Sequence, residues 1–497
     1  MRKILNFSPI QLAIVSGVLV GISYPPIPGL TAWFGFVPLI HLWLNQSKND
    51  SARFTFLSAI IFNSIAFYWI GLNSGASFVP VFLSLTGAVL YLSFILSIFG
   101  WAIAWIEEKQ NNSGLVLIPF LWVTMEWLRS FGPLGFPWAN LAITQTEFLP
   151  LIQIIDFTGS EGVGFWIMIL NVYIYYLIRN NYFYGKKIIL LLAIIVIPWL
   201  YGTIRINQLN TQSWEDIEVA ALQPNINPNE KWEPTYRKTL FAIMDSLNNK
   251  AYDMKPKLVL WPEAALPVYM RVSSAKQVYE NKVRKTTIPL IMGTVDFKRD
   301  TVGRKVFNGS IYFGLNENKI YHKLLLVPFA EYIPLSNKFT FLNKLNFGQA
   351  NFTHGNEFTV FQIDSISFSN MICYESSHPS IARGFINNGA RFLTIQANDA
   401  WLQNSSGVRQ HFELARLRAV ELRTGIIRSA NTGISGIIDP SGRVKHKVKF
   451  YDQEVFKGKI LLNKSLTFYA RFGNIFSIIC FILVLIQGVY ISIRKKQ

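Results

Sequence analysis

One segment in the second half of the chain is the starting point for the fold, and it reads Ser365-Ile366-Ser367-Phe368-Ser369-Asn370-Met371-Ile372-Cys373-Tyr374-Glu375. Its apolar residues first alternate with serines, a period of two that is typical of a strand entering a core. We expect the strand to end at Cys373, with Ser377 as a helix N-cap and Pro379 in the first helical turn. A thiol between a strand end and a helix start lies near the positive end of the helix dipole, which favours the nucleophilic thiolate. On this segment alone, a small buried hydrophobic side chain remains the alternative.

The composition indicates a membrane protein that also carries a sizeable folded domain. Of the 497 residues, 51% are hydrophobic and only 15% are charged, which is too apolar for an ordinary soluble protein. The formal net charge is +18, but many basic residues flank apolar runs, where the positive-inside rule accounts for them. We therefore expect no nucleic-acid partner. The two cysteines are Cys373 and Cys480, and the second lies in an apolar run, so we expect a free thiol at Cys373 rather than a disulfide framework.

Apolar runs divide the chain into three parts. By comparison with the ~20 residues that cross a bilayer, about eight spans are predicted. They lie near residues 4–22, 29–45, 54–73, 78–106, 114–131, 160–179, 187–204 and 473–493. The first run has no small-residue cleavage site after it, which favours a retained span over a signal peptide. We expect a membrane domain at 1–205 with seven spans, an extramembrane domain at 206–470, and a final span with a basic tail at 471–497.

Basic residues between the runs predict the orientation. If the spans alternate, one side of the membrane collects Arg2, Lys3, Lys48, Arg53, Arg179, Lys186, Lys187, Arg494, Lys495 and Lys496. By the positive-inside rule this side is cytoplasmic. Residues 206–470 then face outward, and they are too many and too polar to form a mere loop.

Two features of the membrane part are candidates for a functional role. Glu126 and Arg129 are three residues apart near the end of the fifth span, so they share a helix face and can pair. Ionisable residues at membrane depth are often functional, and a structural ion pair at the interface is the alternative. The following residues 132–138 (Gly-Pro-Leu-Gly-Phe-Pro-Trp) cannot continue a regular helix, which predicts a re-entrant or interfacial segment or a simple connection.

The outward segment alternates between strand-like and helical patterns. Strands are expected at 217–223, 258–261, 289–293, 306–315 and 319–329, helices at 234–249 and 273–285, and further alternation through 366–401 and 409–424. This order predicts an α/β domain in which helices cover the sheets.

Three polar residues stand at or beside apolar strands of this domain: Glu263, Lys323 and Cys373. Each has an ordinary explanation, as a solvated carboxylate, a basic residue on a strand face and a core thiol. Strand ends are, however, where sites gather in open α/β sheets.

In that order, the three residues resemble the Glu-Lys-Cys triad of the nitrilase superfamily. With the flanking spans, the chain is similar to the apolipoprotein N-acyltransferase family over nearly its whole length. The motifs that carry the resemblance are Trp261-Pro262-Glu263-Ala264-Ala265, Val327-Pro328-Phe329-Ala330-Glu331-Tyr332, Ile372-Cys373-Tyr374-Glu375, Asn398-Asp399-Ala400-Trp401, Glu126-Trp127-Leu128-Arg129 and Gly135-Phe136-Pro137-Trp138. The chain departs from the family pattern at Leu325, Ala330 and Leu402, where the family often has His, Gly and Phe. These departures bear on substrate packing and not on the triad.

The resemblance implies an α-β-β-α sandwich and a two-step acyl transfer. Glu263 would take the thiol proton, Cys373 would attack an ester of a phospholipid to form a thioester, and Lys323 would stabilise the oxyanion together with backbone N–H groups. The amine of a lipoprotein's lipidated N-terminal cysteine would then attack the thioester.

The same resemblance implies supporting or substrate-binding residues, a location and partners. The residues are Glu331, Glu375, Tyr374, Trp232, Asn308 and Trp401, with Tyr332 as a further aromatic residue at the meeting point with lipid. For the loop residues among them, ordinary turn or core positions are the alternative. The partners would be a phospholipid donor, a diacylglyceryl-apolipoprotein acceptor and the lipids of the inner membrane, with the catalytic domain on the periplasmic side. No cofactor is expected, and the sequence offers no evident metal-ligand cluster.

Two other functions remain open. A membrane-tethered amidase would use the same triad, with water resolving the thioester. A transporter or assembly scaffold would use the outward domain to bind a ligand, with Glu126 and Arg129 marking a pathway.

Overall fold

A computed structural model describes residues 7–301, 303–336, 338–340, 342 and 350–493. The chain forms two compact units. One comprises Met1–Gly71, Phe82–Thr211 and Phe472–Gln497, and the other comprises Leu72–Val81 and Gln212–Arg471. The second unit therefore includes a short segment that lies between two apolar runs of the sequence. The basic residues Arg2 and Lys3 and the tail 494–497, on which part of the predicted orientation depends, lie outside the described residues.

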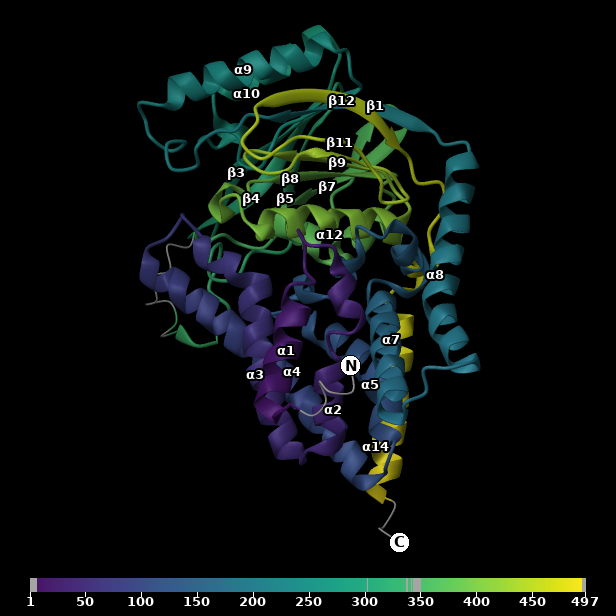
Figure 1. The fold of residues 1–497 in the computed structure, drawn as a ribbon. Coiled ribbons are helices and arrows are strands. Elements are labelled where there is room, and N and C mark those ends of the chain that lie inside the picture. The colour runs from purple at the N-terminus through teal and green to yellow at the C-terminus, as the bar shows by residue number, and fades with distance from the viewer. Residues whose placement is uncertain (1–6, 302, 337, 341, 343–349, 494–497) are drawn as a thin grey trace. The chain divides into compact units, whose positions relative to one another are not determined.

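The first unit is helical, and each predicted span corresponds to a helix (Figure 1). Its helices are α1 (Pro9–Gly21), α2 (Val37–Asn45), α3 (Lys48–Phe67), α4 (Phe78–Lys109), α5 (Ser113–Arg129), α6 (Ile155–Thr158), α7 (Glu161–Asn180), α8 (Lys186–Thr211) and α14 (Ile475–Ile493), with α4 beginning in the second unit. In the described part of the chain, α3 with the turn after it, α4, α7, α8 and α14 are long and apolar enough to cross a membrane. Because α1, α2 and α5 are shorter than the ~20 residues of a full crossing, the count of eight spans is not confirmed.

The predicted pair of Glu126 and Arg129 in α5 is present, and Glu126 also binds the backbone of a later segment. Arg129 Nη2 lies 4.0 Å from Glu126 Oε1, and both side chains are buried. The same carboxylate oxygen accepts a hydrogen bond from the backbone N–H of Leu141 at 2.8 Å. Gly164 makes room for the pair, because a Cβ at that position would lie 2.6 Å from the other carboxylate oxygen. These contacts support the interpretation of a structural ion pair that holds the chain after the helix break.

The second unit contains two six-stranded sheets. The first sheet has the order β12-β1-β2-β3-β4-β5, and its strands are β1 (Asp216–Gln223), β2 (Leu258–Leu260), β3 (Leu290–Asp300), β4 (Gly303–Phe313), β5 (Asn318–His322) and β12 (Glu454–Leu461). The second sheet has the order β11-β10-β9-β8-β7-β6, and its strands are β6 (Phe361–Ile363), β7 (Ile366–Ile372), β8 (Phe392–Ala397), β9 (Ile426–Ala430), β10 (Gly436–Ile438) and β11 (Val444–Lys447). In each sheet three central strands, β1-β2-β3 and β7-β8-β9, run parallel.

The alternation of β1 shows how the layers form. Val219 and Ala221 pack into a core that also contains residues of the second sheet, whereas Ala220 and Leu222 pack with residues of α9 (Arg237–Asp253). Successive side chains of a strand point to opposite faces, so one face of the first sheet meets the other sheet and the other face meets helices. Together with α10 (Ala275–Thr286), α9 covers the first sheet, and α11 (Pro379–Asn387) and α12 (Ser406–Leu422) cover the second (Figure 1). This is the predicted nitrilase-like α-β-β-α sandwich.

Three local expectations were wrong. The strand expected at 319–329 ends at His322, because the chain bends at Leu324 and Leu325. The β3-β4 hairpin is longer than expected, since its ladder continues to Asp300 and Gly303. Ser377 is not the N-cap of the helix that follows. Residues Cys373–Ser377 form a separate 3₁₀ turn, α11 begins at Pro379, and the Ser377 hydroxyl donates instead to the carbonyl of Tyr374 at 2.7 Å.

Candidate active site

The thiol of Cys373 lies at the tight turn that ends the central strand β7. Cys373 directly follows β7 and has a φ of +51°, a left-handed conformation that costs a non-glycine residue roughly 1–3 kcal/mol. Its carbonyl oxygen accepts a hydrogen bond from the Ser376 hydroxyl at 2.8 Å. Strained backbone of this kind persists only where surrounding contacts hold it, and it is found preferentially at functional sites.

Glu375 ties this turn to the segment that follows β5. One of its carboxylate oxygens accepts from the backbone N–H of Ile372 at 2.7 Å. The other accepts from the backbone N–H of Leu324 at 2.7 Å and from the hydroxyl of Tyr321 at 2.5 Å. Burial raises the pKa of Glu375 to about 7, against the hydrogen bonds that lower it. This predicted supporting residue therefore links the nucleophile turn to the residue next to Lys323.

Glu263, Lys323 and Glu331 form a buried charged cluster. Lys323 Nζ lies 2.8 Å from Glu331 Oε2 and 3.7 Å from Glu263 Oε1. Asn308, on β4, donates from Nδ2 to one oxygen of each glutamate at 2.8 Å. Glu263 follows β2 and Lys323 follows β5, so the fold brings together ends of strands that are far apart in the sequence. Asn308 thus links the two glutamates, and Glu331 contacts Lys323 directly.

The electrostatics of the cluster set the protonation states. Burial alone would lower the pKa of Lys323, but the charges of Glu331 and Glu263 raise it above its ordinary value, so the lysine is a cation. Burial raises the pKa of the Cys373 thiol well above its ordinary value, Glu263 raises it further, and Lys323 opposes both. Burial also raises the pKa of Glu263, and the positive charge of Lys323 opposes that increase. Burial and the charge of Glu263 therefore act against the thiolate that the helix-start position was expected to favour, and Lys323 acts in its favour.

The predicted aromatic residues have different environments. Tyr374 is buried, and its ring packs edge-on against His378 with 4.7 Å between centroids. Trp401 packs on the segment Leu72–Val81, because a Cβ at Gly75 would lie 2.9 Å from its indole and its carbonyl accepts from the Ser74 N–H at 3.2 Å. Trp232 is 54% exposed, and it follows the buried Lys231.

Four functional candidates were missed in the sequence. Burial lowers the pKa of Lys231 to about 8, and its Nζ lies 3.5 Å from the carbonyl oxygen of Glu263. In the sequence Asp399 stands out only as part of the motif Asn398-Asp399-Ala400-Trp401, and His411 and Arg428 carry no local signal. These three side chains form a buried group behind Cys373, with His411 Nε2 at 3.0 Å from the Cys373 carbonyl oxygen.

The same group has a donor set of the kind that binds metals. The ligand atoms of Cys373, Asp399 and His411 lie within 4.8 Å of one another. However, Arg428 Nη2 lies 2.6 Å from Asp399 Oδ2, and a guanidinium at that distance repels a metal cation. The arrangement therefore fits a metal ion poorly.

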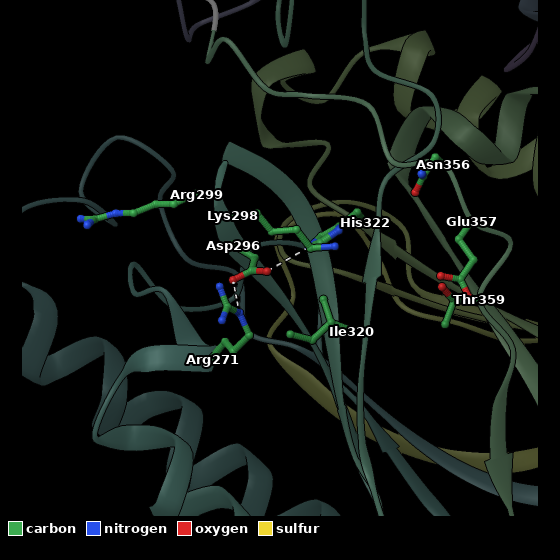
Figure 2. A pocket seen from close by; sticks show the side chains of 9 residues that line it. All are labelled: Arg271, Asp296, Lys298, Arg299, Ile320, His322, Asn356, Glu357 and Thr359. Atoms are coloured by element: carbon green, nitrogen blue, oxygen red, sulfur yellow. Dashed lines mark hydrogen bonds and ion pairs between the residues drawn. The ribbon is translucent and has the colours of Figure 1, made fainter. Parts of the chain in front are cut away.

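A hollow of about 450 Å³ lies elsewhere in this unit, and Figure 2 shows its lining. Asp296 pairs there with Arg271 Nε and His322 Nε2, both at 2.9 Å. Val295 is the register partner of Asn308, and the next residue of the strand points to the opposite face. The hollow is thus on the face of the first sheet away from Asn308, and it is separate from the charged cluster.

Replacing Asp296 with asparagine tests that separation. The change removes a buried carboxylate from two partners and is expected to lower the melting temperature by about 2–6 °C at pH 7, with the catalytic activity per folded molecule unchanged. Burial opposes ionisation, but hydrogen bonds from His322 and Arg271 hold the pKa of Asp296 below its ordinary 3.8. The stability difference is therefore full above that ordinary value and is lost as the pH falls through the lower folded pKa. Thermal denaturation of the full chain at several pH values, with an activity assay, checks both parts, and a loss of activity at full stability would contradict the separation.

Comparisons with known proteins agree with the fold and the motifs. The family description "Apolipoprotein N-acyltransferase N-terminal domain" matches residues 16–173, and "Carbon-nitrogen hydrolase" matches residues 218–464. An apolipoprotein N-acyltransferase of Geobacter metallireducens is 30% identical over 487 residues, which cover 94% of this chain and 92% of that protein. The chain belongs to the apolipoprotein N-acyltransferase family. It is accordingly an acyltransferase, and its long apolar helices make it a membrane protein.

Other apolipoprotein N-acyltransferases match at similar length. The protein of Chlorobaculum tepidum is 29% identical over 529 residues, which cover 98% of this chain and 97% of that protein. Among solved structures, a nitrilase-superfamily protein of Saccharomyces cerevisiae is similar at 19% identity and a TM-score of 0.37. The match covers 50% of this chain and 90% of the yeast chain.

Proposed function

We propose that this protein transfers a fatty acyl chain from a membrane phospholipid, through a thioester on Cys373, to the α-amino group of the lipidated N-terminal cysteine of an apolipoprotein. The observation that carries the proposal is the buried Lys323 cation, which lies between Glu263 and Glu331 and acts electrostatically on the Cys373 thiol. A base that activates the nucleophile, the nucleophile itself and a cation that stabilises the oxyanion are together sufficient for acyl transfer through a covalent intermediate.

In the first step the thiol becomes an acyl carrier. Glu263 accepts the Cys373 proton as the sulfur attacks the ester carbonyl of the phospholipid. Lys323 and backbone N–H groups of the 3₁₀ turn stabilise the oxyanion. When the intermediate collapses, the ester C–O bond breaks and the lysophospholipid leaves with the proton from Glu263. The products are an acyl thioester on Cys373 and a lysophospholipid.

In the second step the acyl chain moves to nitrogen. The α-amine of the acceptor attacks the thioester carbonyl, and Glu263 takes the amine proton. The C–S bond breaks, the thiol recovers its proton, and the product is an amide. The same carboxylate thus serves both steps, with Asn308 and Glu331 holding it and Lys323 in position.

The membrane part supplies access to the donor. Extracting an acyl chain from a bilayer costs ~0.8 kcal/mol per buried CH₂, so a site that meets the chain at the interface avoids most of that cost. Trp232, Tyr332 and Trp401 are the aromatic residues that we assign to this meeting point, since amphipathic rings suit interfaces. Glu375 acts indirectly, by fixing the nucleophile turn.

The proposed topology keeps the predicted divisions 1–205, 206–470 and 471–497, with about eight crossings of the inner membrane in which α1, α2 and α5 serve as the short ones. Support comes from basic residues in two connections of the helical unit. Lys48 and Arg53 lie in the first turns of α3, and Arg179, Lys186 and Lys187 flank the connection between α7 and α8. With these ends cytoplasmic, the catalytic unit faces the periplasm.

The acceptor separates this function from that of an amidase, which the carbon-nitrogen hydrolase match to residues 218–464 keeps as a second candidate. The purified full chain is mixed with phospholipid vesicles and a synthetic diacylated lipopeptide, and the products are identified by mass spectrometry. We expect the N-acylated lipopeptide and lysophospholipid in equal amounts. Free fatty acid without any N-acylated peptide would contradict the proposal and favour the amidase.

A further inference from the structure

We propose that His411 is a positioning residue for acyl transfer, which holds the backbone of Cys373 from behind so that its sulfur keeps its orientation toward Glu263 and Lys323. This inference rests on the proposed function of Cys373 as the acyl carrier. His411 lies in the middle of α12, and its side chain is 1% exposed.

The Nε2 edge of the His411 ring contacts the turn that carries Cys373. Nε2 lies 3.0 Å from the carbonyl oxygen of Cys373 and 3.0 Å from the hydroxyl oxygen of Ser376. A carbonyl oxygen can only accept, so Nε2 must carry the hydrogen in this contact. The Ser376 hydroxyl donates to the same carbonyl. Two donors therefore fix the carbonyl of the residue whose φ is +51°.

The other ring nitrogen is held by a buried ion pair. His411 Nδ1 lies 2.7 Å from Asp399 Oδ1, and Arg428 Nη2 lies 2.6 Å from Asp399 Oδ2 and 3.1 Å from the same Nδ1. Arg428 Nε donates in turn to the carbonyl of Ile434 at 3.0 Å. Asp399 follows β8, His411 is on α12 and Arg428 is on β9, so three elements fix the ring. Burial opposes ionisation, but Arg428 and His411 hold the pKa of Asp399 at about 2, so the anion persists throughout the working range.

The position of Asp399 beside the sulfur gives the group a role beyond packing. The Cys373 sulfur lies within 4.8 Å of the ligand atoms of Asp399 and His411. Burial, Glu263 and Lys323 have the larger effects on the pKa of the Cys373 thiol. The negative charge of Asp399 comes next and raises that pKa. The Arg428 guanidinium, 2.6 Å from Asp399 Oδ2, offsets that charge, which would otherwise oppose the developing thiolate. Gly433 leaves room for the carboxylate, because a Cβ there would lie 2.6 Å from Asp399 Oδ2.

The test compares His411→Ala with His411→Gln, whose amide N–H can replace the Nε2 donor. The measured quantity is the rate of acyl-thioester formation on Cys373 in a single turnover, over a range of phospholipid concentrations and per folded molecule. We expect His411→Ala to lower the maximal rate by about 10²-fold, as a misplaced reacting group does, with the half-saturating phospholipid concentration unchanged. His411→Gln is expected to recover most of that rate.

His446→Ala is the matched control, because His446 also pairs with a carboxylate, Glu454 Oε1 at 2.8 Å, in the same unit. We expect its rate to equal that of the wild type. If His411→Ala does not fold, Asp399→Asn is measured instead and is expected to lower the maximal rate in the same way. Wild-type rates in folded His411 or Asp399 variants would overturn the inference, as would a lower melting temperature with no change in rate. Absence of any thioester in the wild type would refute the proposed function instead, so the two failures are distinguishable.

Discussion

Replacing Cys373 with serine is expected to lower acyl transfer by on the order of 10⁴-fold or more, as the loss of a catalytic nucleophile does in other enzymes. The site already opposes ionisation of a thiol, because burial and Glu263 raise the pKa of Cys373. A serine hydroxyl is a much weaker acid than a thiol, so the same base cannot activate it. The measurement is N-acylated lipopeptide formed by the membrane-inserted variant, with protein amount and melting temperature determined in parallel.

Cys480→Ser is the matched control, since Cys480 is the other cysteine of the chain and lies in α14, outside the catalytic unit. We expect this variant to insert in the membrane and to transfer acyl chains at the wild-type rate. Appreciable transfer by Cys373→Ser would rule out the thioester mechanism. A transporter or scaffold would instead keep its ligand binding in the Cys373→Ser variant, because that binding does not need the sulfur.

Replacing Glu263 with glutamine is expected to lower the rate of thioester formation by about 10²–10⁴-fold, the usual contribution of a general base. Glutamine has nearly the same shape but cannot accept the thiol proton. In the wild type, burial raises the pKa of Glu263, so the carboxylate is lost, and the rate falls, at a higher pH than for an ordinary glutamate. The variant is expected to lack this acidic limb of the pH–rate profile, which single-turnover rates at a series of pH values measure.

Glu357→Gln is the control for the loss of a carboxylate, because Glu357 lines the separate hollow of Figure 2. Its rate and pH profile are expected to match those of the wild type. A Glu263→Gln variant that keeps both the wild-type rate and the acidic limb would show that another group takes the proton, and Lys231, at 3.5 Å from the Glu263 carbonyl oxygen, would be the first to examine.

The triad could be located from the sequence because its members lie at or beside apolar runs and in recognisable motifs, although Lys323 was expected inside a strand and in fact follows β5. The strand before Cys373 ends at Ile372, and Glu263 and Lys323 stand at the ends of β2 and β5. That the three residues lie close together was expected from the family resemblance, because the local sequence pattern does not show it. The protonation state of the sulfur could not be predicted in the same way, because it depends on burial and on charges brought close by folding.

The group behind Cys373 was missed for a physical reason. His411 is one of many polar residues on α12, where neighbours such as Arg409 and Glu413 give no sign of which face is buried. The helix is in fact buried on nearly every side, with ion pairs such as Arg416–Glu413 at 2.5 Å inside it. Its partners are Asp399, which follows β8, and Arg428, which lies on β9, so only the tertiary fold identifies them.

In the helical unit, the positions of the helices could be predicted from the sequence, but their tertiary roles could not. The apolar runs predicted where helices occur, because length and hydropathy are local properties. They did not decide which helices cross the membrane, since α1, α2 and α5 are short. Nor did they predict that Leu72–Val81 belongs with the catalytic unit, where Leu72 and Ser74 bond to the loop that carries Trp401.

The most direct test of the account is a trap-and-chase measurement of the acyl carrier. The full chain is incubated with phospholipid alone, and its intact mass and the peptide containing Cys373 are measured before and after addition of a diacylated lipopeptide. The account predicts one acyl chain in thioester linkage on Cys373, which disappears on the chase while an equal amount of N-acylated lipopeptide forms. An acyl chain attached elsewhere, or a Cys373 adduct that the lipopeptide does not discharge, would contradict it.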